Sequence, residues 1–142
     1  MAERHLPDDL ATEALGETLA RLTPPGGTWL LRGELGAGKT TWTRGFVRGL
    51  GGEPEDVASP TYAVLHRYDL PEGRLFHLDL YRTGPEGAWS LGLEDQITPS
   101  DRLVVEWAGG TAGPWPSAWV AELRLRTDGE GRQADWTIPD QP

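Results

Sequence analysis

The feature that most constrains this chain is a glycine-rich segment from Gly33 to Thr40, which reads GELGAGKT. It fits the pattern G-x-x-x-x-G-K-[ST] at every fixed position. The residues before it, TWLLR, predict a short apolar strand, and the residues after it, KTTWTRGFVRGLGG, predict a helix that Gly51 and Gly52 end. A strand, a glycine-rich loop and a helix in this order are typical of a loop that holds the phosphates of a nucleoside triphosphate.

The fixed residues of this loop each have a chemical reason. Anionic phosphates need several backbone N–H groups pointing inward, and we expect Gly33, Gly36 and Gly38 to let the chain curl tightly enough to supply them. Lys39 is predicted to reach the β and γ phosphates, and the Thr40 hydroxyl to ligate Mg²⁺. The competing interpretation is a glycine-rich turn that binds no ligand.

Lys39 is the one lysine of the chain, beside twelve arginines. Lysine is a compact point charge, whereas the planar fork of arginine would crowd a loop wrapped around phosphates. A guanine-reading [NT]-K-x-D segment would need a second lysine, so ATP is favoured over GTP. The dinucleotide fingerprint G-x-G-x-x-G is set aside because it needs glycine where Thr41 stands.

Two acidic residues are candidates for work beside the metal. Glu106 ends the apolar run LVVE, as the acid of a Walker B strand does, and is predicted to hold Mg²⁺ directly or through water. Asp79 lies inside the otherwise apolar strand FHLDLY, where an unpaired charge is costly, and is our candidate for orienting the attacking water. The alternatives are a surface acid at a strand end for Glu106 and, for Asp79, a buried carboxylate satisfied by arginine or by backbone.

Four further residues each have two interpretations. Thr61 in SPTY is a candidate switch threonine that senses the γ-phosphate, or else a turn threonine. Trp107 either stacks on a base or packs in the core. His77 shares a strand face with Asp79, and a satisfied strand histidine is favoured over a catalytic one. Arg82 is expected in a surface salt bridge rather than at a phosphate.

Composition limits the class of protein. The 142 residues suit a single domain, residues 1–142. A net charge of −9 disfavours direct binding of nucleic acid, because that affinity rests on clustered lysine and arginine. The chain has no cysteine and no apolar run long enough to span a membrane, so we expect a cytoplasmic protein without membrane segments.

The remaining sequence predicts an α/β domain. An amphipathic helix is expected over PDDLATEALGETLARL, and its apolar stripe would be formed by Leu10, Ala11, Ala14, Leu15, Leu19 and Leu22. Two strands joined by a turn are expected in SPTYAVLHRYDLPEGRLFHLDLYR, a short helix in GPEGAWSLGLEDQI, and another strand in RLVVEWA. The tail SAWVAELRLRTDGEGRQADWTIP alternates as a β-hairpin does. Together these predict a P-loop NTPase fold, with a mostly parallel central sheet flanked by helices and an antiparallel C-terminal hairpin.

The ordered set of motifs resembles a known family. GELGAGKTT, SPTY, HLDLYR, LGLED and VVEW occur in the order and spacing of the TsaE family, formerly called YjeE, small bacterial P-loop ATPases required for threonylcarbamoyladenosine formation in tRNA. The resemblance runs from about Pro7 to Trp107. It implies that the phosphates are bound by Gly36, Ala37, Gly38, Lys39, Thr40 and Thr41. It also implies that Thr40 and Glu106 serve Mg²⁺ and that Thr61 and Asp79 support hydrolysis.

The resemblance also has implications for an N-terminal acid, for the tail, where the match is weaker, and for partners. It implies that an acid of the N-terminal segment, here Asp9, and Arg132 of the tail lie near the nucleotide. The partners it implies are TsaB and TsaD, of which TsaD transfers the threonylcarbamoyl group to tRNA, so tRNA would be met only indirectly. The Trp-rich segment GPWPSAWV matches no motif of the family that we can place.

The activity expected from these residues is hydrolysis of ATP with Mg²⁺. Turnover of the isolated protein is expected to be slow, because no residue marks an obvious arginine finger and partners would complete the site. Two alternatives stay open. One is a small-molecule kinase, which needs an acceptor site and a lid, and the other is a docking module that ATP occupancy alone drives.

Overall fold

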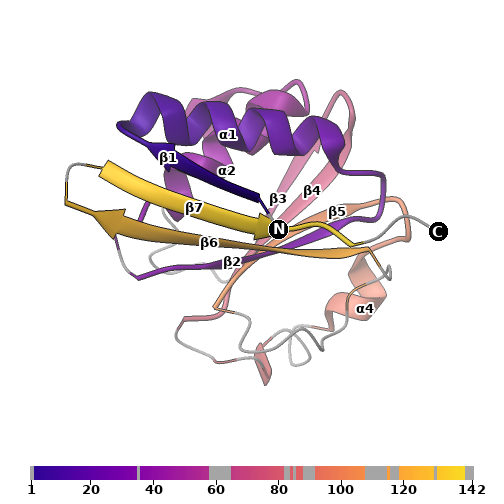
Figure 1. Cartoon of the computed structure of the whole chain (residues 1–142). Coiled ribbons are helices and arrows are strands. Elements are labelled where there is room, and N and C mark those ends of the chain that lie inside the picture. The colour runs from indigo at the N-terminus through magenta and orange to yellow at the C-terminus, as the bar shows by residue number, and fades with distance from the viewer. Residues whose placement is uncertain are drawn as a thin grey trace.

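The computed structural model describes residues 2–34, 36–57, 65–81, 84, 86–87, 92–107, 115, 119–129 and 131–139 of the chain. Within these ranges seven strands form one sheet, in the order β1-β7-β6-β2-β5-β4-β3 (Figure 1). The strands are β1 (Ala2–Leu6), β2 (Thr28–Arg32), β3 (Leu65–Leu70), β4 (Gly73–Asp79), β5 (Arg102–Glu106), β6 (Val120–Asp128) and β7 (Gly131–Thr137).

The sheet is mixed, which corrects the expectation of a mostly parallel one. The parallel pairings are β2 with β5, β2 with β6, and β4 with β5. The pairings of β1 with β7, β6 with β7, and β3 with β4 are antiparallel. Both predicted hairpins, β3 with β4 and β6 with β7, are therefore confirmed, and the parallel strands occupy the middle of the sheet.

Sequence reasoning missed β1 at the sheet edge. Its sequence AERHL carries charged residues, and Leu6 is its one fully buried side chain. The strand forms because its backbone pairs with β7, from Ala2 opposite Trp136 to Leu6 opposite Arg132. A strand defined by a distant pairing partner leaves little periodic pattern of its own.

Helices cover the sheet unequally. The long helices α1 (Asp9–Leu22) and α2 (Lys39–Gly49) lie on one face, and the short helix α4 (Leu93–Gln96) lies on the other (Figure 1). A 3₁₀ turn, η1 (Pro54–Asp56), follows α2. Helix α1 begins where the Asp8 carboxylate accepts a hydrogen bond from the N–H of Ala11 at 2.8 Å. Much of the short helix expected before Leu93 lies outside the described residues.

Small residues let the two long helices approach closely. A Cβ on Gly16 of α1 would lie 2.1 Å from the carbonyl oxygen of Trp42, and a Cβ on Gly45 of α2 would lie 1.8 Å from the carbonyl oxygen of Glu13. Neither position can hold a larger residue without moving backbone atoms. The glycines therefore fix which side of each helix faces its neighbour.

This contact also corrects the predicted apolar stripe of α1. Leu10 and Leu22 are 75% and 58% exposed, so they do not belong to the buried side. The buried residues of the helix are Thr12, Leu15, Gly16, Leu19 and Ala20. A threonine and a glycine thus take the place that the periodicity assigned to leucines.

The sheet separates two apolar cores. The larger lies between the sheet and the pair α1 and α2, and its biggest side chains include Trp29, Trp42 and Phe46. The smaller lies on the opposite face against α4 and includes Leu30, Phe76 and Leu93. No helix of the described ranges is both long and apolar enough to cross a membrane.

The central strands bring the predicted site together. Because β2, β5 and β4 run parallel and side by side, their carboxyl ends meet at one edge. Leu31 lies opposite Glu106, and Glu106 lies opposite Asp79. Strand β2 then continues directly into the glycine-rich loop, and α2 begins at Lys39.

Candidate functional site

The glycine-rich loop ends at a residue that only glycine fits well. Gly38, the N-cap of α2, has φ 105°, a left-handed conformation in which other residues are strained. A Cβ there would lie 2.8 Å from Nε of Arg132. Gly38 gives the start of α2 no side-chain cap hydrogen bond, so this position leaves the backbone N–H groups of the first turn without a side-chain partner of its own, as anion binding requires.

Lys39 is held at the mouth of this loop. Its side chain is only 6% exposed, and its Nζ donates a hydrogen bond to the carbonyl of Gly33 at 2.5 Å. The same Nζ lies 3.8 Å from the centre of the Trp107 ring, a cation–π contact. Burial lowers the pKa of the Lys39 ammonium, and the nearby carboxylates Glu106 and Asp79 oppose that shift. The cation is thus placed between a loop that can bind phosphate and two acids.

Glu106 is buried at the end of β5 and pairs with a histidine. It is 3% exposed, and its Oε2 lies 2.5 Å from Nε2 of His77, which is 1% exposed. Burial of a carboxylate is costly unless a partner compensates it, and His77 supplies that partner. The interpretation of Glu106 as a surface acid is therefore wrong.

Asp79 ends β4 beside Glu106. Its Oδ1 accepts the backbone N–H of Tyr81 at 2.9 Å. Burial raises the pKa of the Asp79 carboxyl above its ordinary value, although the N–H of Tyr81 acts the other way. The described residues give Asp79 no arginine partner, but the backbone N–H of Tyr81 satisfies one of its oxygens, which agrees with the alternative of a carboxylate satisfied by backbone.

Residues from both ends of the chain meet at the start of α2. Nη1 of Arg132 donates hydrogen bonds to Oδ1 of Asp9 at 2.6 Å and to Oγ1 of Thr12 at 3.1 Å. The guanidinium also lies beside Gly38, since a Cβ on that glycine would lie 2.9 Å from the Arg132 Cζ. Asp9 and Arg132 thus lie next to the loop. Sequence reasoning missed Thr12, which gives no signal because a threonine in a helix has no distinctive pattern.

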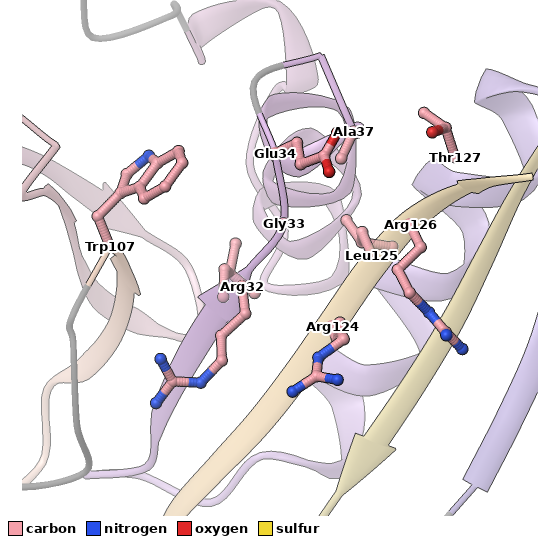
Figure 2. A pocket seen from close by; sticks show the side chains of 10 residues that line it. Arg32, Gly33, Glu34, Ala37, Trp107, Arg124, Leu125, Arg126 and Thr127 are labelled. Atoms are coloured by element: carbon pink, nitrogen blue, oxygen red, sulfur yellow. The ribbon is translucent and has the colours of Figure 1, made fainter.

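A pocket opens beside the start of the loop, next to Trp107. It has a volume of about 650 Å³ and is lined by Leu31, Arg32, Gly33, Glu34, Ala37, Trp107, Arg124, Leu125, Arg126 and Thr127. Figure 2 shows the Trp107 ring on one side, the arginines of β6 on the other, and the start of the loop between them. Its charges are largely balanced, since Arg32 pairs with Glu122 at 2.9 Å and Arg126 with Asp135 at 3.3 Å. Sequence reasoning did not identify these arginines, although Arg124 and Arg126 alternate along one strand as residues of a common face do.

The remaining predicted residues are placed as follows. Thr40 and Thr41 lie half-buried in the first turn of α2. Trp107 is half-buried, and its ring contacts Lys39 and also Tyr81, at 4.9 Å between ring centres. Thr61 and Arg82 lie outside the described residues.

The oxygen donors of the site are of the kind that Mg²⁺ takes. Among the described residues there is no group of three or more His, Cys, Asp or Glu side chains that could hold a metal ion by itself. Mg²⁺ is usually bound by one or two protein oxygens together with phosphates and water. One hydroxyl, Thr40, and one buried carboxylate, Glu106, therefore fit such an ion, and carboxylates that bind a metal are commonly hydrogen-bonded in turn, as Glu106 is to His77.

Comparisons with known proteins agree on one family. A sequence model described as "Threonylcarbamoyl adenosine biosynthesis protein TsaE" matches residues 6–134. A protein of Nostoc sp. named "tRNA threonylcarbamoyladenosine biosynthesis protein TsaE" is 37% identical over 145 residues, covering 96% of this chain and 86% of that protein. A Haemophilus influenzae protein of the same name is 32% identical over 121 residues, covering 81% of this chain and 76% of that protein.

A Bacillus subtilis relative and a solved structure complete the comparison. The B. subtilis protein carrying that same name is 39% identical over 97 residues, which is 68% of this chain but only 60% of the relative. The crystal structure of B. subtilis YdiB superposes with a TM-score of 0.68 at 24% identity, covering 96% of this chain and 84% of that chain. The structural likeness extends over nearly the whole α/β fold described above.

Proposed function

This chain belongs to the TsaE family, and from that premise we propose that it binds and hydrolyses ATP with Mg²⁺ in support of tRNA threonylcarbamoyladenosine formation. The family takes part in that biosynthesis. The observation that carries the proposal is the meeting of Lys39, Glu106 and Asp79 at the loop, because Leu31 near the end of β2 lies opposite Glu106 and Glu106 lies opposite Asp79. The two carboxylates also favour the charged form of Lys39, against the effect of burial on its pKa. A buried cation beside two acids at a glycine-rich loop that begins a helix is suited to triphosphate and metal.

The chain's own residues have separate parts in this proposal. The loop amides and Lys39 neutralise charge that develops on the phosphates, for which Lys39 exchanges the Gly33 carbonyl for phosphate oxygens. Thr40 and Glu106 hold Mg²⁺, which supplies charge neutralisation on the phosphate oxygens when bound. Asp79 orients the attacking water, and its raised pKa makes it a better proton acceptor than an ordinary aspartate.

Trp107, Arg132 and Asp9 all lie beside the loop and have separate places next to the nucleotide in this proposal. Lys39 contacts Trp107, so the phosphate end lies toward that ring. Arg132 and Asp9 lie beside Gly38, which supports them as neighbours of the nucleotide. The proposal therefore uses Trp107 as a neighbour of the phosphates and not as a stacking partner for the base.

The decisive experiment measures ATP hydrolysis by the wild type and by Lys39→Ala, each with and without TsaB and TsaD. We expect slow turnover of the isolated wild type, acceleration by the two proteins, and hydrolysis reduced at least a hundredfold, on the order seen when one charge-stabilising group is removed, in Lys39→Ala. The matched control is Arg21→Ala, which removes an exposed cation paired with Glu17 on α1 and should leave turnover unchanged. Undiminished hydrolysis by Lys39→Ala would overturn the site, and equal rates with and without partners would overturn the dependence on them.

Asp79→Asn separates hydrolysis from binding. The substitution removes the proton acceptor but keeps the shape of the side chain, so ATP binding should persist while hydrolysis falls. Threonylcarbamoyladenosine formation that continues in this variant would favour the docking module, in which ATP occupancy alone is needed.

A further inference from the structure

His77 makes a contact that the strand pattern did not suggest. It lies on β4 opposite Val104, two residues short of the end of β5, and reaches diagonally to the Glu106 side chain. The His77 and Glu106 side chains are 0% and 4% exposed. The favoured interpretation from sequence was a histidine satisfied within the strand, yet its hydrogen bond goes to the one acid that ends β5.

In the described part of the chain this is the one hydrogen bond of each side chain, and the His77 ring also lies 6.4 Å from the His66 ring between centres. Among the described residues, the Glu106 side chain has no other hydrogen-bond partner, so its Oε1 is left free. Nδ1 of His77 is buried and has no partner there either. Histidines kept for packing usually have both ring nitrogens satisfied. We therefore interpret the position of the His77 ring as serving its hydrogen bond to Glu106.

The direction of the bond follows from the acceptor. A carboxylate oxygen accepts, so Nε2 of His77 is the donor of this bond. The Lys39 ammonium attracts the same carboxylate, since the charge of Glu106 favours the charged form of Lys39.

We propose that His77 is a positioning residue, whose Nε2–H donates to Oε2 of Glu106 and so keeps the other carboxylate oxygen available for the Mg²⁺ of the bound nucleotide. The proposal rests on the proposed function, because it concerns the metal of that site. A group that donates a hydrogen bond to a metal-binding carboxylate fixes the orientation of that carboxylate. Loss of such a donor commonly reduces metal affinity by about ten- to a hundredfold.

Two amide substitutions test the donor position. Glutamine carries an N–H at about the place of Nε2, whereas asparagine carries one at about the place of Nδ1. Calorimetry should give the dissociation constant of ADP in EDTA and again at increasing Mg²⁺, for wild type, His77→Gln and His77→Asn. The matched control is His66→Asn, because His66 is the cross-strand neighbour of His77 and packs against its ring at 6.4 Å between centres, but makes no hydrogen bond to Glu106 among the described residues.

The expected result is specific to the metal. His77→Asn should need about ten- to a hundredfold more Mg²⁺ to reach its full ADP affinity, with the affinity in EDTA unchanged. His77→Gln should stay close to wild type, and His66→Asn should equal it. Circular dichroism establishes that each variant is folded.

Other results overturn the proposal. An unchanged Mg²⁺ requirement in His77→Asn, or an equal loss of ADP affinity in EDTA and in Mg²⁺, would mean that His77 only packs. A folded His77→Gln as impaired as His77→Asn would exclude donation from Nε2. A wild type whose ADP affinity does not respond to Mg²⁺ would overturn the metal in the proposed function itself, and this inference with it.

Discussion

At the scale of single residues, Trp107 has a backbone conformation that is unfavourable for a tryptophan, whereas its side chain makes favourable contacts. Its φ of 62° is the one positive value outside glycine among the described residues. This conformation costs an ordinary residue roughly 1–2 kcal/mol. The ring contacts with Lys39 and Tyr81 offset the cost, and strained residues of this kind gather at functional sites.

Two substitutions at Trp107 separate these contributions. Both Trp107→Ala and Trp107→Gly remove the ring, but only glycine adopts the left-handed conformation freely. We expect the free energy of unfolding of Trp107→Gly to exceed that of Trp107→Ala by about 1 kcal/mol, measured by urea denaturation. The same pair at Trp136, in the strand β7, should show the reverse order by about 0.5–1 kcal/mol. An alanine variant at least as stable as the glycine variant at residue 107 would contradict the strain.

The residues that sequence reasoning found at the site are those with a local pattern. Lys39 belongs to a fixed motif, and Glu106 and Asp79 stand out as acids in apolar strands. The bond of His77 to Glu106 and the contact of Thr12 with Arg132 join residues far apart in the chain. Such contacts depend on strand order and helix packing, which one sequence does not display.

At the scale of elements, the contact between α1 and α2 depends on glycine. Gly45→Ala would place a Cβ 1.8 Å from the carbonyl oxygen of Glu13. On an exposed helix the same change stabilises by about 1 kcal/mol, because alanine is the better helix former. Here we expect a loss of about 3 kcal/mol in the free energy of unfolding, since overpacking against backbone forces the helices apart.

Urea denaturation of Gly45→Ala measures this loss. The control is Leu10→Ala on the exposed side of α1, which should change the free energy of unfolding by less than about 0.5 kcal/mol. A stabilised Gly45→Ala would show that helix propensity outweighs packing at this contact.

A second element-scale feature ties β4 to the start of β5. The Arg74 guanidinium donates to both carboxylate oxygens of Asp101, at 3.0 and 2.6 Å, and the N–H of Thr98 donates at 2.8 Å. Burial alone would raise the pKa of the Asp101 carboxyl, but these hydrogen bonds outweigh it and hold the pKa below its ordinary value. A carboxyl with a depressed pKa stabilises the fold above its ordinary pKa, and the stabilisation is lost as the pH falls through the lower value.

Asp101→Asn should therefore lower the midpoint of urea denaturation at pH 7. The difference from wild type should shrink as the pH falls below about 4, because the wild-type carboxyl then takes up its proton. Asp95→Asn, at an exposed acid of α4, serves as the control and should show no such convergence. A difference that stays constant down to pH 3 would mean that the ionised carboxylate contributes nothing to stability.

At the scale of the whole molecule, the two apolar cores share the strands of one sheet. Strand β2 sends Trp29 and Leu31 into the larger core and Leu30 into the smaller one. Loss of either core therefore disturbs the strand on which the other is built. We expect residues 1–142 to unfold as one cooperative unit, with coincident transitions by tryptophan fluorescence and far-ultraviolet circular dichroism. Two separated transitions would indicate independent units and contradict the single domain predicted from chain length.

The order and direction of the strands were harder to predict from the sequence than the individual helices and strands. The lengths of β2, β5 and both hairpins follow from local alternation and apolar runs. Whether the sheet is parallel depends on which strands pair, and the charged strand β1 exists only through β7. The exposure of Leu10 and Leu22 follows from the glycine contact between helices, which a periodicity of 3.6 residues cannot foresee.

The central place of β2 has a consequence for how the protein is made. Both of its neighbours, β5 and β6, follow it in the chain, and β6 begins only at Val120. While a ribosome is still adding residues, the glycine-rich loop follows a strand whose two edges lack their partners, and such long-range pairings form slowly. Nascent chains arrested before Val120 should therefore fail to retain nucleotide, and this capacity should arise during synthesis only after β6 has emerged.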